Sequence, residues 1–222
     1  MITHLQREIE NLKKKILAMS AEVEESLRSA VVSLVKRDVR LAQAVIDGDR
    51  RIDNLEVEIE EDCLKILALH QPVAIDLRYV VAVLKINSDL ERIGDEAVNI
   101  AERAAYLATH APIDLPLDFK GMADKAQSMV FKSIDALVNL DTALARQVRA
   151  SDDEVDEMNR HMYELLQDYV GTHPDRMAES VHLLSTSRHL ERIADQATNI
   201  AEDVIYMVEG EIVRHQPEDF SK

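Results

Sequence analysis

The chain has 222 residues, and its 42 acidic and 26 basic side chains give a formal charge of −16. So negative a chain is repelled by nucleic-acid phosphates and by anionic lipid surfaces, which argues against direct binding to either. Cations and basic protein surfaces are the expected partners. Scarce glycine and proline, no tryptophan and many Ala, Leu and charged residues are typical of a helical protein and argue against sandwiches and barrels.

The single cysteine, Cys63, excludes an intrachain disulfide and fits a reducing compartment. The first 15 residues are amphipathic and lack the apolar core of a signal peptide. The longest strongly apolar run, at 79–84, is far shorter than the roughly 20 residues that span a bilayer. We therefore expect a cytoplasmic protein that reaches a membrane only indirectly, through its partners.

The first half of the chain predicts three helices. Apolar residues recur every three or four positions over 5–34, which indicates a long amphipathic helix. Asp38 is suited to cap a short helix over 41–46, and Asp47-Gly48-Asp49 is expected to break the chain before a second helix that ends near Leu69.

A turn at His70-Gln71-Pro72 is predicted next, with Pro72 in the first position of a third helix. This third helix is expected to end near His110, and a linker over 112–117 follows. The same plan then returns in the second half. Its predicted elements are a helix from Phe119 to Asn139, a cap at Asp141, a fifth helix after Ser151-Asp152, a turn over 171–174, a sixth helix to about Glu209 and a C-cap at Gly210.

The strongest signal is an internal repeat. LERIGDEAVNIAER from Leu90 and LERIADQATNIAED from Leu190 share ten of fourteen residues. LAQAVIDGDRRIDNL from Leu41 matches LARQVRASDDEVDEM from Leu144 at an offset of 103. Two matches in the same order predict a duplication, with a first repeat over 1–111 and a second over 118–222.

Core packing explains the matched apolar residues but not the matched polar ones. Glu91, Asp95, Asn99 and Glu102 share a helical arc of roughly 80°. Like charges four residues apart on a helix repel each other, and a solvated face has no reason to keep the same acidic residues in both halves of the chain. Something positive is therefore expected beside this row. Its counterparts in the second half are Glu191, Asp195, Asn199 and Glu202.

The preceding helix of each half supplies facing acids. Asp49 and Asp53 are four apart, and Glu56 and Glu60 extend their stripe; Asp152 and Asp156 repeat the pair, with Asn159 in place of Glu56. If the two helices of each half are antiparallel neighbours, four carboxylates converge. Oxygen-rich sites of this kind suit Mg²⁺, Mn²⁺ or iron better than soft metals. The alternative is an ordinary solvated acidic face.

At these residues the sequence closely resembles the PhoU family. The strings QPVAIDLRYVVAVLKINSDLERIGDEAVNIAER and SRHLERIADQATNIAEDVIYMVEGEIVRH carry the resemblance. It implies an all-α fold: a tandem duplication of an antiparallel three-helix bundle, with six main helices and pseudo-two-fold symmetry. Gly94 in place of Ala194 is not expected to touch the acidic rows.

The resemblance further implies metal binding through paired E/D-x-x-x-D motifs, with Mg, Mn, Fe or Zn as candidate ions. It implies negative control of the phosphate-starvation response, linking a phosphate ABC transporter to a PhoR-like histidine kinase, and a homodimer. The candidate metal ligands are Asp49, Asp53, Glu91, Asp95, Asp152, Asp156, Glu191 and Asp195, with Asn99, Glu102, Asn199 and Glu202 as additional ones.

Two rival functions stay open. A ferritin-like di-metal enzyme needs a Glu-x-x-His string on two helices, and only Glu179 with His182 forms one. His189 falls roughly opposite Glu191 and is not expected to share its metal. Without a phosphate loop or nucleophile motif, we do not expect an enzyme. The second rival is an acidic helical adaptor that binds protein directly and needs no metal.

Overall fold

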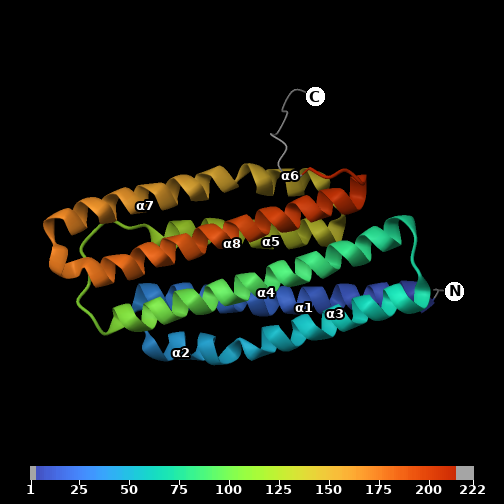
Figure 1. Cartoon of the computed structure of the whole chain (residues 1–222), viewed down its shortest axis with the longest axis horizontal. Helices are drawn as coiled ribbons and strands as arrows, with labels where there is room; N and C mark the ends of the chain where they lie inside the picture. Colours follow the sequence, from blue (N-terminus) through green and yellow to red (C-terminus); the bar gives the residue numbers. More distant parts are fainter. Residues whose placement is uncertain (1–3, 214–222) are drawn as a thin grey trace, which may run out of the picture.

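The computed structural model describes residues 4–213, and all regular structure within that range is helical. Figure 1 shows the helices as long rods, with α2 and α3 forming one bent rod and α6 and α7 another. The helices are α1 (His4–Lys36), α2 (Val39–Gly48), α3 (Arg50–His70), α4 (Ala74–Ala108), α5 (Phe119–Asn139), α6 (Thr142–Ala150), α7 (Asp152–Thr172), the 3-10 turn η1 (Pro174–Arg176) and α8 (Met177–Glu209). The prediction of a duplicated all-α fold is confirmed.

The predicted caps hold the short helices in place. The Asp38 carboxylate accepts hydrogen bonds from the backbone N–H groups of Arg40 and Leu41 at 2.9 and 3.1 Å, which starts α2. Asp141 accepts one from the N–H of Leu144 at 2.9 Å and starts α6. Gly210, at φ 77°, ends α8 in the left-handed region that glycine adopts without strain.

Two predicted turns differ from the structure. Pro72 does not begin α4: it is buried, Val73 after it is extended, and the helix starts only at Ala74. The turn expected over 171–174 is shorter, because α7 continues through Thr172 and η1 follows at once. Glycine in the last turn of a helix lowers its stability but does not end it.

Each half is a three-rod bundle around an apolar core. One face of α1 carries Leu12, Ile16, Met19, Val23 and Leu27, all at most 1% exposed, against α3 and α4. Charged pairs close the edges; Lys15 of α1, for example, lies 2.7 Å from Asp62 of α3. Burial of the apolar stripe, not these exposed pairs, supplies most of the stability.

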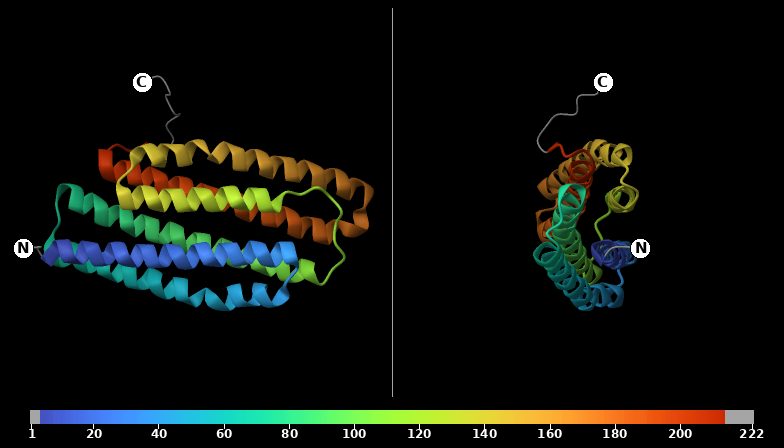
Figure 2. Two further views of the ribbon diagram at one scale, coloured as in Figure 1. Left: turned by 180° about the vertical axis from the view of Figure 1, so that it is seen from behind. Right: turned by 90° about the vertical axis from the view of Figure 1, so that its right-hand side faces the viewer.

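The two bundles lie side by side. Figure 2 shows α1 next to α5 on one side of the molecule and α4 next to α8 on the other, and both pairs are in contact. The helices α4 and α8 run antiparallel, because Arg78 donates to the carbonyl of Met207 at 3.0 Å while Lys85 donates to Asp203 at 2.7 Å. We call this contact the seam. The irregular stretch 109–118 joins α4 to α5.

No helix among residues 4–213 has an apolar segment of the length that crossing a bilayer requires.

Candidate metal centres

The turn after α3 makes α3 and α4 antiparallel neighbours, and the corresponding turn does the same for α7 and α8. A polar contact fixes each pair beside its acidic residues. The buried Asn87 side chain donates to the Glu56 carbonyl at 2.9 Å, and at the matching positions Ser187 donates to the Asn159 side chain at 2.8 Å. The acidic rows of consecutive helices therefore face each other, as the sequence predicted they must for a shared site.

Mutual repulsion in the first repeat shows how close these rows lie. Burial, and then the charges of Asp53 and Asp95, raise the pKa of Asp49 to about 6. Burial and the neighbouring Asp53 and Glu96 also raise the pKa of Asp95. The pKa of Glu91 is raised by burial and by Asp95, and by acids of α3. The carboxylates of each helix thus disfavour ionisation of the carboxyl groups on the other helix, and a bound cation would relieve this repulsion.

The second repeat has the same arrangement. Burial, Asp195 and Asp156 raise the pKa of Asp152 to about 6, with a smaller opposing effect from the neighbouring Thr198 hydroxyl. Burial raises the pKa of Glu191 and of Asp195, and in both cases Asp156 across the helix pair adds to it. The buried Oδ1 of Asp152 accepts no hydrogen bond of ordinary geometry from the described residues. A buried acceptor of this kind fits an oxygen-ligand cation site.

The expectation about Gly94 is wrong. A Cβ atom at Gly94 would lie 3.1 and 3.3 Å from Cδ1 and Cγ2 of Ile52 and 3.6 Å from Oδ1 of Asp49. Glycine lets α3 approach α4 closely beside the first acidic group, so this residue does touch the acidic row. The sequence of α4 alone does not reveal this contact, because helix propensity concerns one helix and not the neighbour that packs against it.

The additional candidates make other contacts. The Asn99 amide donates to Glu96 at 3.4 Å, and Glu102 pairs with Arg103 at 2.6 Å. Glu202 lies 3.3 Å from Arg149 of α6. Asn199 lines a hollow at the seam together with Lys85 and Arg92 of α4. The eight principal residues thus form two groups, while these four make the separate contacts just described.

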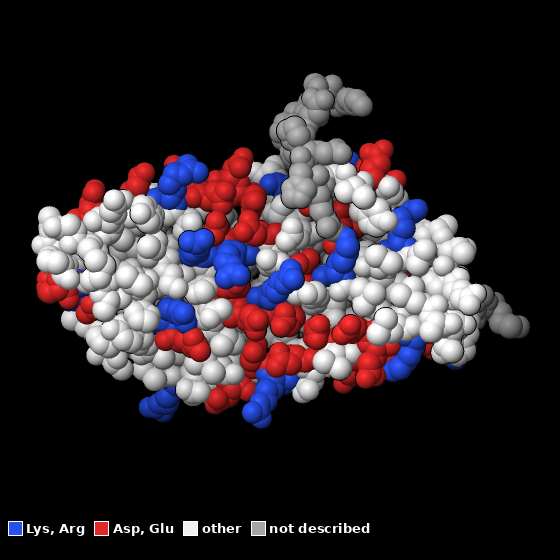
Figure 3. Space-filling view, viewed as in Figure 1, with Lys and Arg blue, Asp and Glu red and all other residues white. Residues whose placement is uncertain are grey.

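Both acidic groups lie on one face of the molecule. Figure 3 shows acidic side chains gathered over α7 and α8 and again over α3 and α4, with Lys and Arg side chains between them. Among residues 4–213, no three His, Cys, Asp or Glu side chains stand in an arrangement that could hold a metal ion as they are placed. Occupancy therefore requires carboxylates to turn toward the ion, and their partial exposure leaves room for this.

The Glu-x-x-His string is engaged elsewhere. Glu179 pairs with Arg176 at 3.2 Å, and the His182 ring stacks on Tyr106 of α4 with 3.8 Å between centroids. Burial, Arg103 and His110 lower the pKa of His182. These contacts give His182 a structural position at the seam, which does not resemble a ligand pair of a di-metal enzyme.

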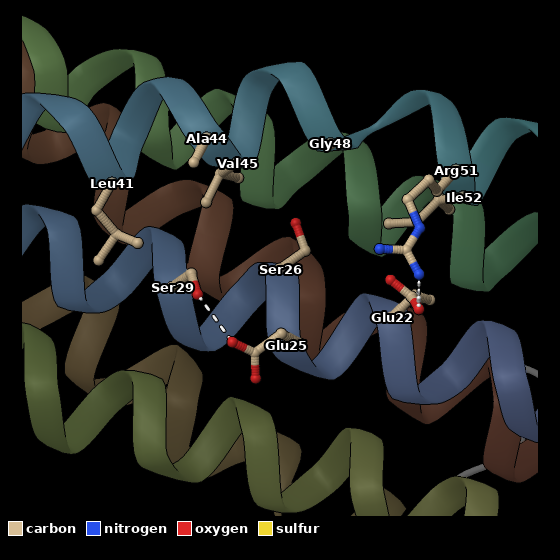
Figure 4. Close-up of a pocket in the computed structure, with 10 residues that line it drawn as sticks. All are labelled: Glu22, Glu25, Ser26, Ser29, Leu41, Ala44, Val45, Gly48, Arg51 and Ile52. Atoms are coloured by element: carbon tan, nitrogen blue, oxygen red, sulfur yellow. Dashed lines mark hydrogen bonds and ion pairs between the residues drawn. The ribbon is translucent and has the colours of Figure 1, made fainter.

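The other side of α3 carries a separate small hollow of about 170 Å³ near its bend from α2. In Figure 4, Arg51 reaches across it to Glu22 of α1, and Ser29 donates to Glu25 at 3.2 Å. Its Glu22 is paired with Arg51, and its Glu25 is paired with Arg28 of the same helix, so the hollow is not part of the acidic sites.

Two polar features escaped the sequence reasoning. Glu96 of α4 meets His189 and Arg192 of α8 inside the seam. A groove between α7 and α8 is lined by Arg160 and Arg188 next to the second acidic group. A search for residues that are identical in the two repeats misses both features. Glu96 is aligned with Gln196 and Arg188 with Ser88, so neither position is identical.

Comparison with known proteins decides the family. The PhoU domain model matches residues 16–104 and again 119–204, one match in each repeat. The chain belongs to the PhoU family. A PhoU homologue from Aquifex aeolicus is 44% identical over 210 residues, 95% of each chain, and one from Pseudomonas aeruginosa is 37% identical over 209 residues, 94% of this chain and 86% of its own. Both are named phosphate-specific transport system accessory proteins, a name that describes no enzyme.

Solved PhoU structures share the whole fold. The crystal structure of PhoU from Pseudomonas aeruginosa superposes with a TM-score of 0.91 at 36% identity, covering 94% of this chain and all of that one. The PhoU regulatory protein from Streptococcus pneumoniae gives 0.84 at 28% identity, covering 95% and 99%. The tandem PhoU fold is therefore shared along nearly the full described chain.

Proposed function

We propose that this chain is a metal-binding regulator of phosphate uptake and signalling. Its relatives are named accessory proteins of a phosphate-specific transport system, and the match covers 95% and 82% of two of them. In this proposal it acts in the cytoplasm as a homodimer, and it restrains the phosphate-starvation response by linking a phosphate ABC transporter to a PhoR-like histidine kinase. It meets the membrane only through these partners.

The observation that carries the metal proposal is electrostatic. In both repeats, acids on consecutive helices raise one another's pKa, and Asp49 and Asp152 each reach about 6. Folding brings these charges together, at a cost in stability that a divalent cation would reduce. Carboxylate oxygens from two helices suit Mg²⁺, Mn²⁺ or iron, and Zn²⁺ to a lesser degree.

Metal analysis tests this directly. Protein purified without added salts is assayed for bound metal, then titrated with Mn²⁺ under electron paramagnetic resonance. We expect Glu91→Ala/Asp95→Ala to lose one class of bound ion and keep its helical circular dichroism. The matched control is Glu61→Ala/Glu157→Ala, which removes two exposed acids outside both rows. Equal Mn²⁺ binding by both variants would count against the proposed sites.

The second candidate function is a metal-free adaptor whose acidic face binds basic protein surfaces. The face in Figure 3 favours it, since both acidic groups are open to a single partner. Capture of the kinase and of the transporter ATPase, with and without chelator, separates the two functions. Capture that is lost in chelator supports the metal-dependent regulator, and capture that is unchanged supports the adaptor.

A deletion strain tests the regulatory role. Loss of the protein should derepress phosphate-starvation genes in phosphate-rich medium, and a plasmid copy should restore repression. Normal repression in the deletion strain would contradict the role whatever the metal content.

A further inference from the structure

The largest groove beside an acidic site lies between α7 and α8. It has a volume of about 580 Å³ and runs from Asp156 and Glu191 at one end to Tyr163 and Val181 at the other. Tyr163 and Val181 are 50% and 54% exposed, so this end is an open apolar surface. The acidic end is one half of the second candidate metal centre.

Two arginines stand in the middle of this groove, Arg160 from α7 and Arg188 from α8. Both are exposed. Arg160 pairs with Glu157 of its own helix. Exposed ion pairs of this kind stabilise a protein very little, so Arg160 can exchange Glu157 for an anion that binds it better. Arg188 lines the same groove as Glu191, one helical turn before it on α8, so it stands beside the acidic group.

The matching surface of the first repeat is different. At the offsets of the repeat, Arg160 corresponds to Val57 and Arg188 to Ser88. Tyr163 corresponds to Glu60, so the first surface has neutral residues in place of the two arginines and an acid in place of the aromatic ring. The two acidic groups are alike, but of the two matching surfaces it is the second that carries arginines at these positions. Packing does not require this difference, because these side chains are exposed.

We propose that the α7–α8 groove binds a phosphate group, held by Arg160 and Arg188 and adjoining the cation at the second acidic site. Guanidinium forks match phosphate oxygens in geometry and charge. Without a cation, Asp156 and Glu191 repel such an anion. A divalent cation would offset these two carboxylates and leave the charges of the two arginines to attract the anion. Binding of cation and phosphate is therefore mutually reinforcing, and each raises the affinity for the other by the same factor. This inference rests on the proposed metal site.

The test uses the full chain loaded with Mn²⁺, and its probes are inorganic phosphate and phenyl phosphate. Paramagnetic broadening of the ³¹P signal reports phosphate near bound Mn²⁺, and electron paramagnetic resonance reports Mn²⁺ binding separately. We expect Arg188→Ala to weaken phosphate binding about tenfold, the effect of one charge-assisted contact. Mn²⁺ binding should change little. The control Arg92→Ala, beside the first acidic group, should leave phosphate binding unchanged.

The duplication supplies a second control. Asp152→Asn/Asp156→Asn should abolish the ³¹P broadening, and Asp49→Asn/Asp53→Asn should keep it. Tighter binding of phenyl phosphate would identify an organic phosphate as the ligand, with its ring on Tyr163, and equal binding would identify the free ion. If Mn²⁺ binds but neither probe does, or if Arg92→Ala acts like Arg188→Ala, the phosphate site is wrong. If Mn²⁺ itself does not bind, the metal proposal fails and this inference with it.

Discussion

The Glu96 carboxylate of α4 lies 2.6 Å from Nδ1 of His189 of α8, in the middle of the seam between the repeats. Its other oxygen lies 3.0 Å from Arg192, and Ser185 lies 3.0 Å from the second ring nitrogen of His189. Glu96 and His189 are 5% and 9% exposed, so water cannot replace these contacts freely. The seam is thus held by a buried polar cluster as well as by apolar packing.

Breaking this cluster should loosen the whole molecule. We expect Glu96→Ala to lower the free energy of unfolding by about 3 kcal/mol, because His189 and Arg192 lose a buried charged partner. The control is Gln196→Ala at the matching position, where the amide oxygen has no hydrogen-bond partner among the described residues. It should cost less than about 1 kcal/mol. Urea unfolding followed by circular dichroism measures both, and equal losses would contradict the role of the cluster.

Replacing Gly94 with alanine is not expected to raise the stability of the protein, although this substitution usually stabilises a helix. Alanine adds about 1 kcal/mol of helix propensity, but its Cβ would press on Ile52 at 3.1 Å. Gly94→Ala should therefore show no net stabilisation and should weaken Mn²⁺ binding at the first site, since α3 must move. The reverse change in the second repeat, Ala194→Gly, should cost about 1 kcal/mol or more. A gain of about 1 kcal/mol from Gly94→Ala would show that the contact yields easily.

The raised pKa values predict how stability varies with pH. An aspartate in an unfolded chain titrates near pH 4, while Asp49 and Asp152 titrate at about 6 in the folded protein. The folded state binds more protons between these values, so the two residues lower stability as pH rises from about 4 to 6. Above about 6 their cost is complete.

Asp49→Asn/Asp152→Asn should remove this dependence. In chelator, its melting temperature should exceed that of the wild type by an amount that grows from about pH 4 to 6 and then stays constant. Saturating Mn²⁺ should raise the melting temperature of the wild type more than that of the variant. A difference independent of pH would show that the two carboxyl groups titrate normally.

The caps of α2 and α6 should act independently. Asp38→Ala and Asp141→Ala each remove a side-chain acceptor at a helix start and should cost about 1 kcal/mol. They occupy different bundles, so the double variant should lose the sum of the two. Thermal and urea unfolding measure the three variants. A loss well below the sum would mean that the two bundles share a cap-dependent step.

Much of this architecture could be predicted from the sequence because its signals are local. Helical periodicity gave the rods, Asp38 and Asp141 gave the caps, and the repeat gave two acidic groups on facing helices. Pro72 misled because its preference for a helix start says nothing of burial, and here it packs inside the turn. Sequence preferences for helix starts indicate where a helix can begin, but they do not indicate what the residue at that position packs against.

The contacts across the seam could not be predicted in the same way. Glu96 and His189 are 93 residues apart, and their meeting depends on the register of α4 against α8. The four additional candidates shared an arc with the acidic row, but an arc of roughly 80° is wide enough to face two neighbours. Asn99 and Asn199 lie on its seam side, with Glu96 and with Lys85.

The seam also constrains how this protein arose. The helices α4 and α8 cover each other along the seam, so a single-repeat ancestor of half the length would have exposed that side of its last helix. Two such chains packed in the same antiparallel way would cover that side, and the present molecule has the arrangement of such a pair joined into one chain. Fusion released the two copies from strict symmetry. Glu96 could then diverge from Gln196, and arginines could accumulate in one copy alone.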